Sequence, residues 1–191
     1  MSAELLTSAP VLDIAGSGEI TSMPILILNV HENCNCKCKM CDIWRRPAGG
    51  ELSLEKIADY QSSIRKLNVR HVVLTGGEPL LHSHFRELCV LLKQCDVRIT
   101  LLSTGLLLQK RADAIAEFVD EVIVSLDGPE DVHNAIRNVA RAYELMRGGI
   151  AALRRLRPHL SIRARSTVQS ANFRHLRQTV AAAKQLAGGL I

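Results

Sequence analysis

Four cysteines lie within eight consecutive residues of this chain, in the segment Cys34-Asn-Cys-Lys-Cys-Lys-Met-Cys41. They are too close together for an ordinary disulfide framework, and the N-terminus lacks the basic and then apolar pattern of a secretory leader. We therefore expect a cytoplasmic protein in a reducing compartment, where such a segment indicates a metal-binding or redox-active site.

The spacing Cys-x3-Cys-x2-Cys, through Cys34, Cys38 and Cys41, can wrap one iron–sulfur cubane. A cubane normally takes four cysteines, so three would leave one iron open to a substrate, as a catalytic zinc keeps one position free. Structural zinc, a redox Cys-x-x-Cys pair and buried structural cysteines are the alternatives. Cys36 is only two residues from both Cys34 and Cys38, so the loop would be strained if it were a fourth ligand. We interpret it as a bystander thiol. The separate Cys89 is interpreted as a core residue.

The composition is that of a soluble globular protein. The 191 residues are 47% hydrophobic and 23% charged, which excludes disordered, collagen-like and low-complexity chains. No apolar run is long enough to cross a membrane. The net charge of +5 is interpreted as a solvated basic surface, because aromatic residues, at 3%, are too scarce for a base-stacking surface. We expect neither a membrane nor a nucleic-acid partner.

Short apolar runs alternate with helical patterns along the chain, after an N-terminal lead of residues 1–22 that holds one short strand around residues 11–14. The expected strands are residues 24–30, 72–74, 97–102, 122–124 and 161–168. The expected helices begin at the N-cap Ser53, cover residues 85–92 and 107–118, run from Val139 past Leu153, and cover residues 172–187 with Asn172 as cap. About five βα units require a parallel sheet, because parallel neighbours need a crossover. The fold class is therefore α/β, a partial (β/α) barrel, with residues 23–191 as its single core domain.

Polar motifs follow the first four expected strands. The cysteines follow the first, Thr75-Gly-Gly-Glu-Pro79 the second, Ser103-Thr-Gly105 the third and Ser125-Leu-Asp-Gly-Pro129 the fourth. Parallel sheets and barrels place their chemistry at the carboxyl ends of the strands. The motifs are thus predicted to form one site.

The end of the chain raises two further expectations. Residues 188–191 resemble the approach to a sixth strand that does not follow, so we expect a piece of a longer design or a truncated barrel. Arg163 and Arg165 alternate with Ala164 and Ser166 and therefore share one face of a strand. They would meet a phosphate or carboxylate if that face lines the barrel interior, and would otherwise be solvated.

In combination, these motifs resemble the radical S-adenosylmethionine (radical SAM) superfamily over about residues 25–186, in the branch of molybdenum-cofactor cyclases and peptide- and sulfatase-modifying enzymes. The resemblance implies a [4Fe-4S] cluster that cleaves S-adenosylmethionine reductively into methionine and a 5′-deoxyadenosyl radical. The radical abstracts hydrogen from a substrate, here an unknown small molecule or peptide. An electron donor such as flavodoxin or ferredoxin is implied as partner. The alternative is a non-catalytic iron–sulfur or zinc-binding protein on a barrel remnant.

The resemblance also implies the site residues, and none of them is catalytic beyond the cluster. The cluster would be held by Cys34, Cys38 and Cys41, and S-adenosylmethionine would be contacted by Met40, Gly77, Glu78, Ser103, Ser125 and Arg137. Gly77 would meet the methionine amino group, Arg137 the carboxylate, and Glu78 would hold the ammonium or anchor its loop. Two departures are visible: Met40 replaces the usual aromatic residue, and the Asn that normally precedes Gly105 is missing.

Overall fold

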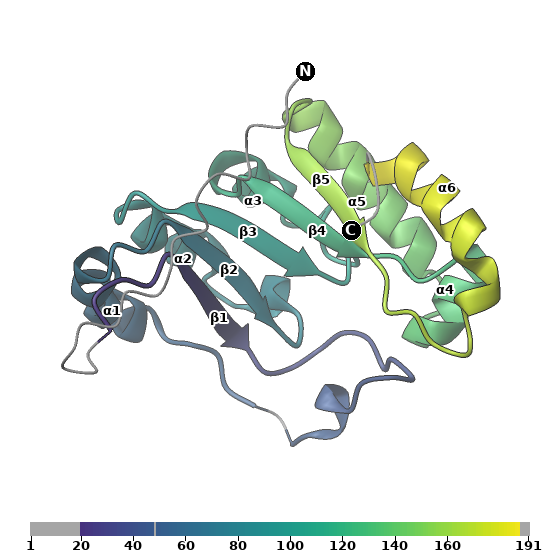
Figure 1. Cartoon of the computed structure of the whole chain (residues 1–191), viewed down its shortest axis with the longest axis horizontal. Helices are drawn as coiled ribbons and strands as arrows, with labels where there is room; N and C mark the ends of the chain where they lie inside the picture. The colour runs from purple at the N-terminus through teal and green to yellow at the C-terminus, as the bar shows by residue number, and fades with distance from the viewer. Residues whose placement is uncertain (1–19, 48, 188–191) are drawn as a thin grey trace.

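Five parallel strands form one sheet, in which they lie side by side in chain order (Figure 1). The computed structural model describes residues 20–47 and 49–187. The strands are β1 (Ile25–His31), β2 (His71–Gly76), β3 (Arg98–Ser103), β4 (Glu121–Ser125) and β5 (Ser161–Arg165). Each neighbouring pair is parallel. The predicted α/β fold with five βα units is thus confirmed.

The helices between the strands cover one face of the sheet, and in Figure 1 α2 and α3 lie behind it. They are α1 (Leu54–Lys66), α2 (Phe85–Lys93), α3 (Ala112–Phe118), α4 (Glu130–Arg137), α5 (Ala142–Leu156) and α6 (Leu176–Ala187), with the 3-10 turns η1 (Ile43–Arg45), η2 (Pro79–Leu81) and η3 (Phe173–His175). None of the helices in the described part of the chain is long and apolar enough to cross a membrane.

Strand alternation divides the sheet into a packed face and an open face. Leu74 and Leu101 point to the helices and are fully buried. On the opposite face, Ile25 is 53% and Ile27 is 66% exposed, because no described helix lies over them. The polar motifs lie at the carboxyl ends of the strands, next to this open face.

Two predicted helices were wrong in their bounds. The helix expected at 107–118 begins only at Ala112, because residues 106–111 form turns in which Leu108 is fully buried. The long helix expected to include Val139 is two helices, α4 and α5. Asn138 separates them with a left-handed φ of 53°, a conformation that Asn tolerates better than most residues.

The region around Asn172 also differs from the prediction. β5 ends at Arg165 instead of residue 168, because the Thr167 N–H leaves the sheet and donates to Asp127 Oδ1 at 3.0 Å. Asn172 is the N-cap residue of η3, but its side chain makes no capping hydrogen bond. Its buried side chain donates to the carbonyls of Asp127 and Thr167, each at 3.0 Å. The short strand expected at 11–14 and the approach to a sixth strand at 188–191 lie outside the described residues.

Asn172→Ala should destabilise the fold, because it leaves the buried carbonyl of Asp127, and the carbonyl of Thr167, without this donor. Leaving a buried polar group unpaired costs about 1–3 kcal/mol, so the free energy of unfolding in urea should fall by at least that amount. Arg177→Ala, at an exposed position of α6, is the control. Equal stability of the two variants would show that the side chain of Asn172 does not tie these two loops together.

Candidate functional site

A cavity of about 280 Å³ lies at the carboxyl ends of the strands. All five strands or the loops that follow them contribute to its wall. Of the predicted site residues, those that line it are Cys34, Cys38, Met40, Cys41, Gly77, Ser103, Ser125 and Arg137. Cys36 and Glu78 are buried and do not line it. The structure therefore brings the motifs of the first four βα units together, with Arg165 and Thr167 added from the fifth.

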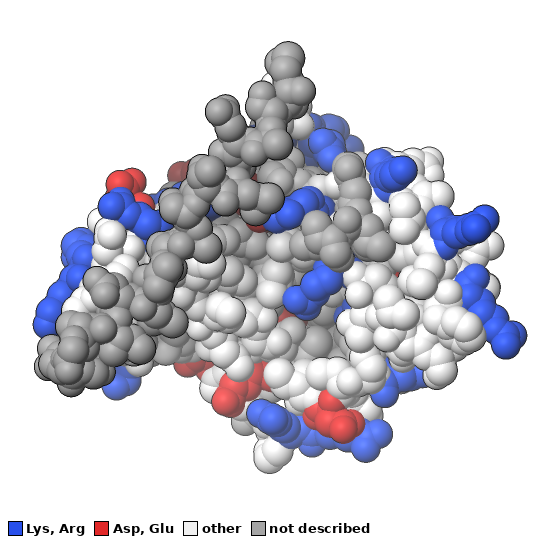
Figure 2. Space-filling view, viewed as in Figure 1, with Lys and Arg blue, Asp and Glu red and all other residues white. Residues whose placement is uncertain are grey.

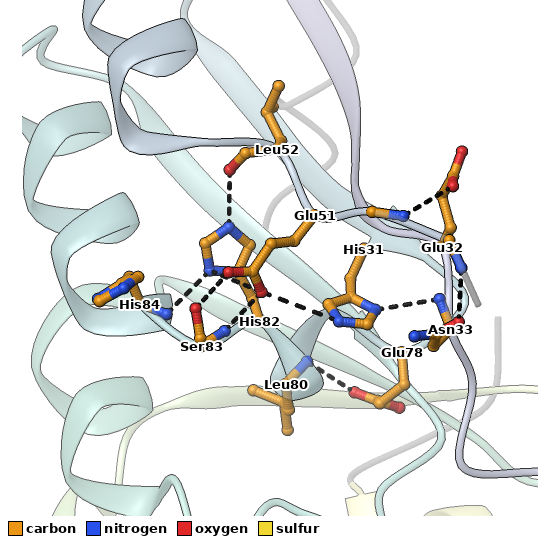
Figure 3. Close-up of polar contacts among 12 residues, drawn as sticks. His31, Glu32, Asn33, Glu51, Leu52, Glu78, Leu80, His82, Ser83 and His84 are labelled. Carbon is orange, nitrogen blue, oxygen red and sulfur yellow. Dashed lines mark hydrogen bonds and ion pairs between the residues drawn. The ribbon is translucent and has the colours of Figure 1, made fainter.

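The cysteines lie on a long loop after β1 whose two ends are joined by a short stem (Figure 3). His31 and Glu51 form an isolated antiparallel bridge, and the Leu52 N–H donates to the Val30 carbonyl at 3.0 Å. Ser83 fixes the Glu51 carboxylate through its hydroxyl and its backbone N–H, and these hydrogen bonds lower the pKa of Glu51. The stem holds both ends of the loop near η2.

A second histidine supports the stem from the loop after η2. His82 is 1% exposed and contacts the Leu52 carbonyl through Nε2 at 2.8 Å, while its Nδ1 accepts from the His84 N–H at 3.1 Å (Figure 3). The two contacts hold the ring of His82 between the Leu52 carbonyl and the His84 N–H. Sequence reasoning missed these residues, since no spacing in the sequence relates His31, Glu51 and His82.

The Gly-Gly segment after β2 packs directly against the backbone of the cysteine loop. The Gly77 N–H donates to the His31 carbonyl, and the Glu78 N–H donates to the Asn33 carbonyl, both at 2.8 Å. A Cβ on Gly77 would lie 2.1 Å from the Asn33 oxygen, and Gly76 has a φ of +138°. Both positions therefore require glycine. Besides lining the cavity, Gly77 makes room for the loop that carries the cysteines.

Glu78 anchors the surrounding loops. Its Oε2 accepts from the Thr104 N–H at 2.7 Å and from the Thr104 hydroxyl at 2.6 Å, and its Oε1 accepts from Ser103 and from the Leu80 N–H at 2.9 and 3.1 Å. Complete burial raises the pKa of Glu78, and these donors oppose the shift. The Thr104 hydroxyl oxygen also lies 3.0 Å from the side-chain amide of Asn35 on the cysteine loop. This placement favours the loop-anchoring role over contact with an ammonium group.

Arg137 connects β4, α4 and the cysteine loop. Its Nη2 lies 2.5 Å from Asp127 Oδ2, and its Nη1 lies 3.6 Å from Cys38 Sγ. Its backbone carbonyl accepts from the Lys37 N–H at 3.2 Å. The buried Nε of Arg137 has no hydrogen-bond partner among the described residues. One donor of this guanidinium is thus used by no described residue.

The local charges favour thiolates in the cluster segment. Hydrogen bonding from Cys36 lowers the pKa of Cys34. The same donor, together with the Arg137 guanidinium, lowers the pKa of Cys38 to about 6. The pKa of Cys36 is raised, because hydrogen bonding with Cys34 and Cys38 and burial favour its protonated form. Thiolates are the form in which cysteine binds metals.

The thiols are placed as the ligands of a multi-iron cluster require. No group of three His, Cys, Asp or Glu side chains in residues 20–47 and 49–187 is gathered closely enough to hold one metal ion. In a cubane each thiolate binds a different iron, so the thiols need only line a common cavity, as Cys34, Cys38 and Cys41 do. The donor set therefore fits a [4Fe-4S] cluster.

His133, in the fourth motif, is a buried neutral histidine. Its Nδ1 accepts from the Asp127 N–H at 3.2 Å, and its ring packs edge-on against Tyr143. Burial and the nearby Arg137 lower the pKa of His133 to about 4. It does not line the cavity, so it positions the loop that carries Asp127.

Comparison with known proteins gives a consistent family assignment. Residues 28–164 match the family described as the radical SAM superfamily. A pre-heme d1 synthase of Dinoroseobacter shibae is 31% identical over 157 residues, which are 78% of this chain and 38% of that protein. A probable GTP 3′,8-cyclase of Archaeoglobus fulgidus is 29% identical over 63% of this chain and 45% of that protein. The chain thus spans less than half the length of these two relatives.

Solved structures with low sequence identity share the fold. Native anSMEcpe with bound AdoMet and Cp18Cys peptide aligns with a TM-score of 0.70 at 20% identity, over 84% of this chain and 47% of that chain. Streptococcus suis SuiB bound to precursor peptide SuiA aligns with a TM-score of 0.69 at 15% identity, over 86% of this chain and 38% of that chain. At these identities the likeness concerns the fold alone.

Gly77→Ala should reduce the capacity of the chain to take up iron. The new Cβ overlaps the Asn33 carbonyl, so the cysteine loop must move away from β2. We expect a lower iron content after anaerobic reconstitution. Gly50→Ala is the matched control, because a Cβ there meets nothing within 4 Å. Equal iron content in both variants would contradict a tight contact between loop and strand.

His133 should make stability depend on acidity. The unfolded chain binds this proton near pH 6.5 and the folded chain only near pH 4, so stability present above pH 6.5 is lost as the pH falls through this window. Each pH unit within it contributes up to about 1.4 kcal/mol. In urea titrations at pH 7 and pH 5, His133→Asn should lose less stability than the wild type. The same change at exposed His159 controls for composition, and identical losses in wild type and His133→Asn would refute the buried neutral state.

Proposed function

This chain belongs to the radical SAM superfamily, and we propose that it is an enzyme that holds a [4Fe-4S] cluster and S-adenosylmethionine in the cavity at the strand ends. When bound, these cofactors supply the reductive cleavage that yields methionine and a 5′-deoxyadenosyl radical for hydrogen abstraction from a substrate. The protein binds, orients and shields the reacting groups.

One observation carries this proposal: the four clustered cysteines are divided by their placement. Cys34, Cys38 and Cys41, at the x3 and x2 spacing, line the cavity, while Cys36 is 1% exposed and lies outside it. Three thiolates for four irons leave one position free, where a ligand can bind.

The residues around the thiols fit the groups of S-adenosylmethionine. Arg137 lines the cavity beside Cys38 with its Nε unpaired, which suits the methionine carboxylate. Ser103 and Ser125 offer hydroxyls at the ends of β3 and β4. Met40 provides an apolar and polarisable surface in the place where we expect the adenine. Gly77 exposes backbone to the cavity without a Cβ.

The reductant is proposed to be an acidic electron-transfer protein such as flavodoxin or ferredoxin. Cys41 is exposed, and residues 37–46 around it include Lys37, Lys39, Arg45 and Arg46 against the single acidic residue Asp42. Lys37 and Arg45 flank the ring of Trp44, which donates to the Cys38 carbonyl at 3.4 Å. Figure 2 shows basic side chains at the lower edge, beside acidic ones, where Figure 1 places this loop. Such a surface attracts an acidic partner.

Anaerobic reconstitution should give a brown protein with about four irons per chain, the content of one cubane. Cys34→Ala, Cys38→Ala and Cys41→Ala should each abolish the cluster, because each removes a ligand. Cys36→Ala is the matched control and should retain it. A colourless protein that keeps zinc under iron-replete anaerobic growth would support the structural-zinc alternative instead.

A further inference from the structure

We propose that Arg165 binds an anionic group, a carboxylate or a phosphate, of the substrate that enters the cavity. This inference rests on the proposed function and names the chemical class of its substrate. It is carried by the position of Arg165, by the absence of a described partner for its guanidinium, and by the charge of the cavity wall.

Arg165 is the last residue of β5, on the open face of the sheet. Ile162 and Ala164 of the same strand are buried against the helices, whereas Arg163 and Arg165 point to the opposite side and are exposed. In the parallel register, Arg165 lies beside Ser125 at the end of β4, and both residues line the cavity. The face shared by the two arginines is therefore the inner face of the half-barrel.

The other arginines that face this side of the sheet have carboxylate partners. Arg163 contacts Glu121 through Nε and Nη2, both at 2.6 Å. Arg98 lies 3.8 Å from the same carboxylate, and Arg137 is paired with Asp127. The Arg165 guanidinium has no ion pair and no hydrogen bond within residues 20–47 and 49–187; only its backbone carbonyl is used, by the Leu126 N–H at 2.9 Å.

The cavity wall carries positive charge without a compensating acid. Among its 16 lining residues are two arginines and no Asp or Glu. Arg137 is paired with Asp127, so Arg165 is the arginine of this wall that has no ion pair with a described residue. Hydroxyls of Ser125 and Thr167 lie in the same wall and can donate to the same ligand. A guanidinium fork with flanking hydroxyls suits a carboxylate or phosphate group.

Two anions could use this position, the carboxylate of S-adenosylmethionine or a group of the substrate. Arg137 lies 3.6 Å from the sulfur of Cys38 and keeps an unpaired Nε, so it already provides a cation beside the cluster ligands. Arg165 comes from the strand at the other edge of the described sheet, two strands away from β3. We therefore assign Arg165 to the substrate.

The test measures anion binding to the reconstituted chain saturated with S-adenosylmethionine, under anaerobic conditions and without turnover. Pyrophosphate serves as the phosphate probe and glutarate as the carboxylate probe, and calorimetry gives both affinities. Arg165→Gln should weaken binding of at least one probe by about tenfold or more, and Arg165→Lys should weaken it less. Arg155→Gln, on the outer face of α5, is the matched control and should bind as the wild type does.

A second arm distinguishes the two sources of the anion. Affinity for S-adenosylmethionine should be unchanged in Arg165→Gln. If it falls tenfold while affinity for the decarboxylated analogue stays constant, Arg165 holds the cofactor carboxylate and the inference is overturned. It is also overturned if a loaded wild-type chain binds neither probe, or binds them no better than Arg165→Gln. A wild-type chain that takes up neither iron nor S-adenosylmethionine would overturn the proposed function, and this inference with it.

Discussion

The buried ion pair between Arg137 and Asp127 is the contact on which the rest of the site depends. Arg137, at the end of α4, contacts the cysteine loop through its backbone carbonyl and Cys38 through its guanidinium. Asp127 accepts a hydrogen bond from the Thr167 N–H in the loop after β5. One pair thus joins the cluster segment to the ends of β4 and β5. Removing one partner of a buried ion pair typically lowers the stability of the fold by about 3–5 kcal/mol, because the other charge stays buried without a partner. Of the two charges, Arg137 lowers the pKa of the Cys38 thiol and so favours the thiolate, while Asp127 opposes this shift.

Glu78 has a corresponding role on the other side of the cavity. It joins the end of β2 to that of β3, and Thr104 extends this connection to Asn35 on the cysteine loop. A loop without helix or strand around its cysteines cannot fix their positions by itself. It is held instead by the Gly77 contact, the His31–Glu51 stem and the two buried acids. The polar groups of the strand-end motifs are therefore used as much for holding the loop as for meeting a ligand.

The sequence was sufficient for the features that depend on local pattern. Periodicity predicted all five strands and their parallel arrangement. The predicted helix cap Ser53 accepts the Lys56 N–H through its hydroxyl. Predictions failed where distant contacts override local preference. Asn172 has a good capping side chain, but the carbonyls of Asp127 and Thr167, 45 and 5 residues away in sequence, use its amide instead. The same holds for the stem, because nothing local relates His31 to Glu51. The contacts of the predicted site residues with their cofactors stay predictions.

The central claim is that three thiolates leave one iron of the cluster open to S-adenosylmethionine. The most direct test is the electron paramagnetic resonance spectrum of the reduced, reconstituted chain with and without S-adenosylmethionine. Binding at the open iron changes the ligands of the cluster, so the signal should shift on addition of S-adenosylmethionine. A strong cluster signal that S-adenosylmethionine leaves unchanged would contradict the account and favour a closed, non-catalytic iron–sulfur centre.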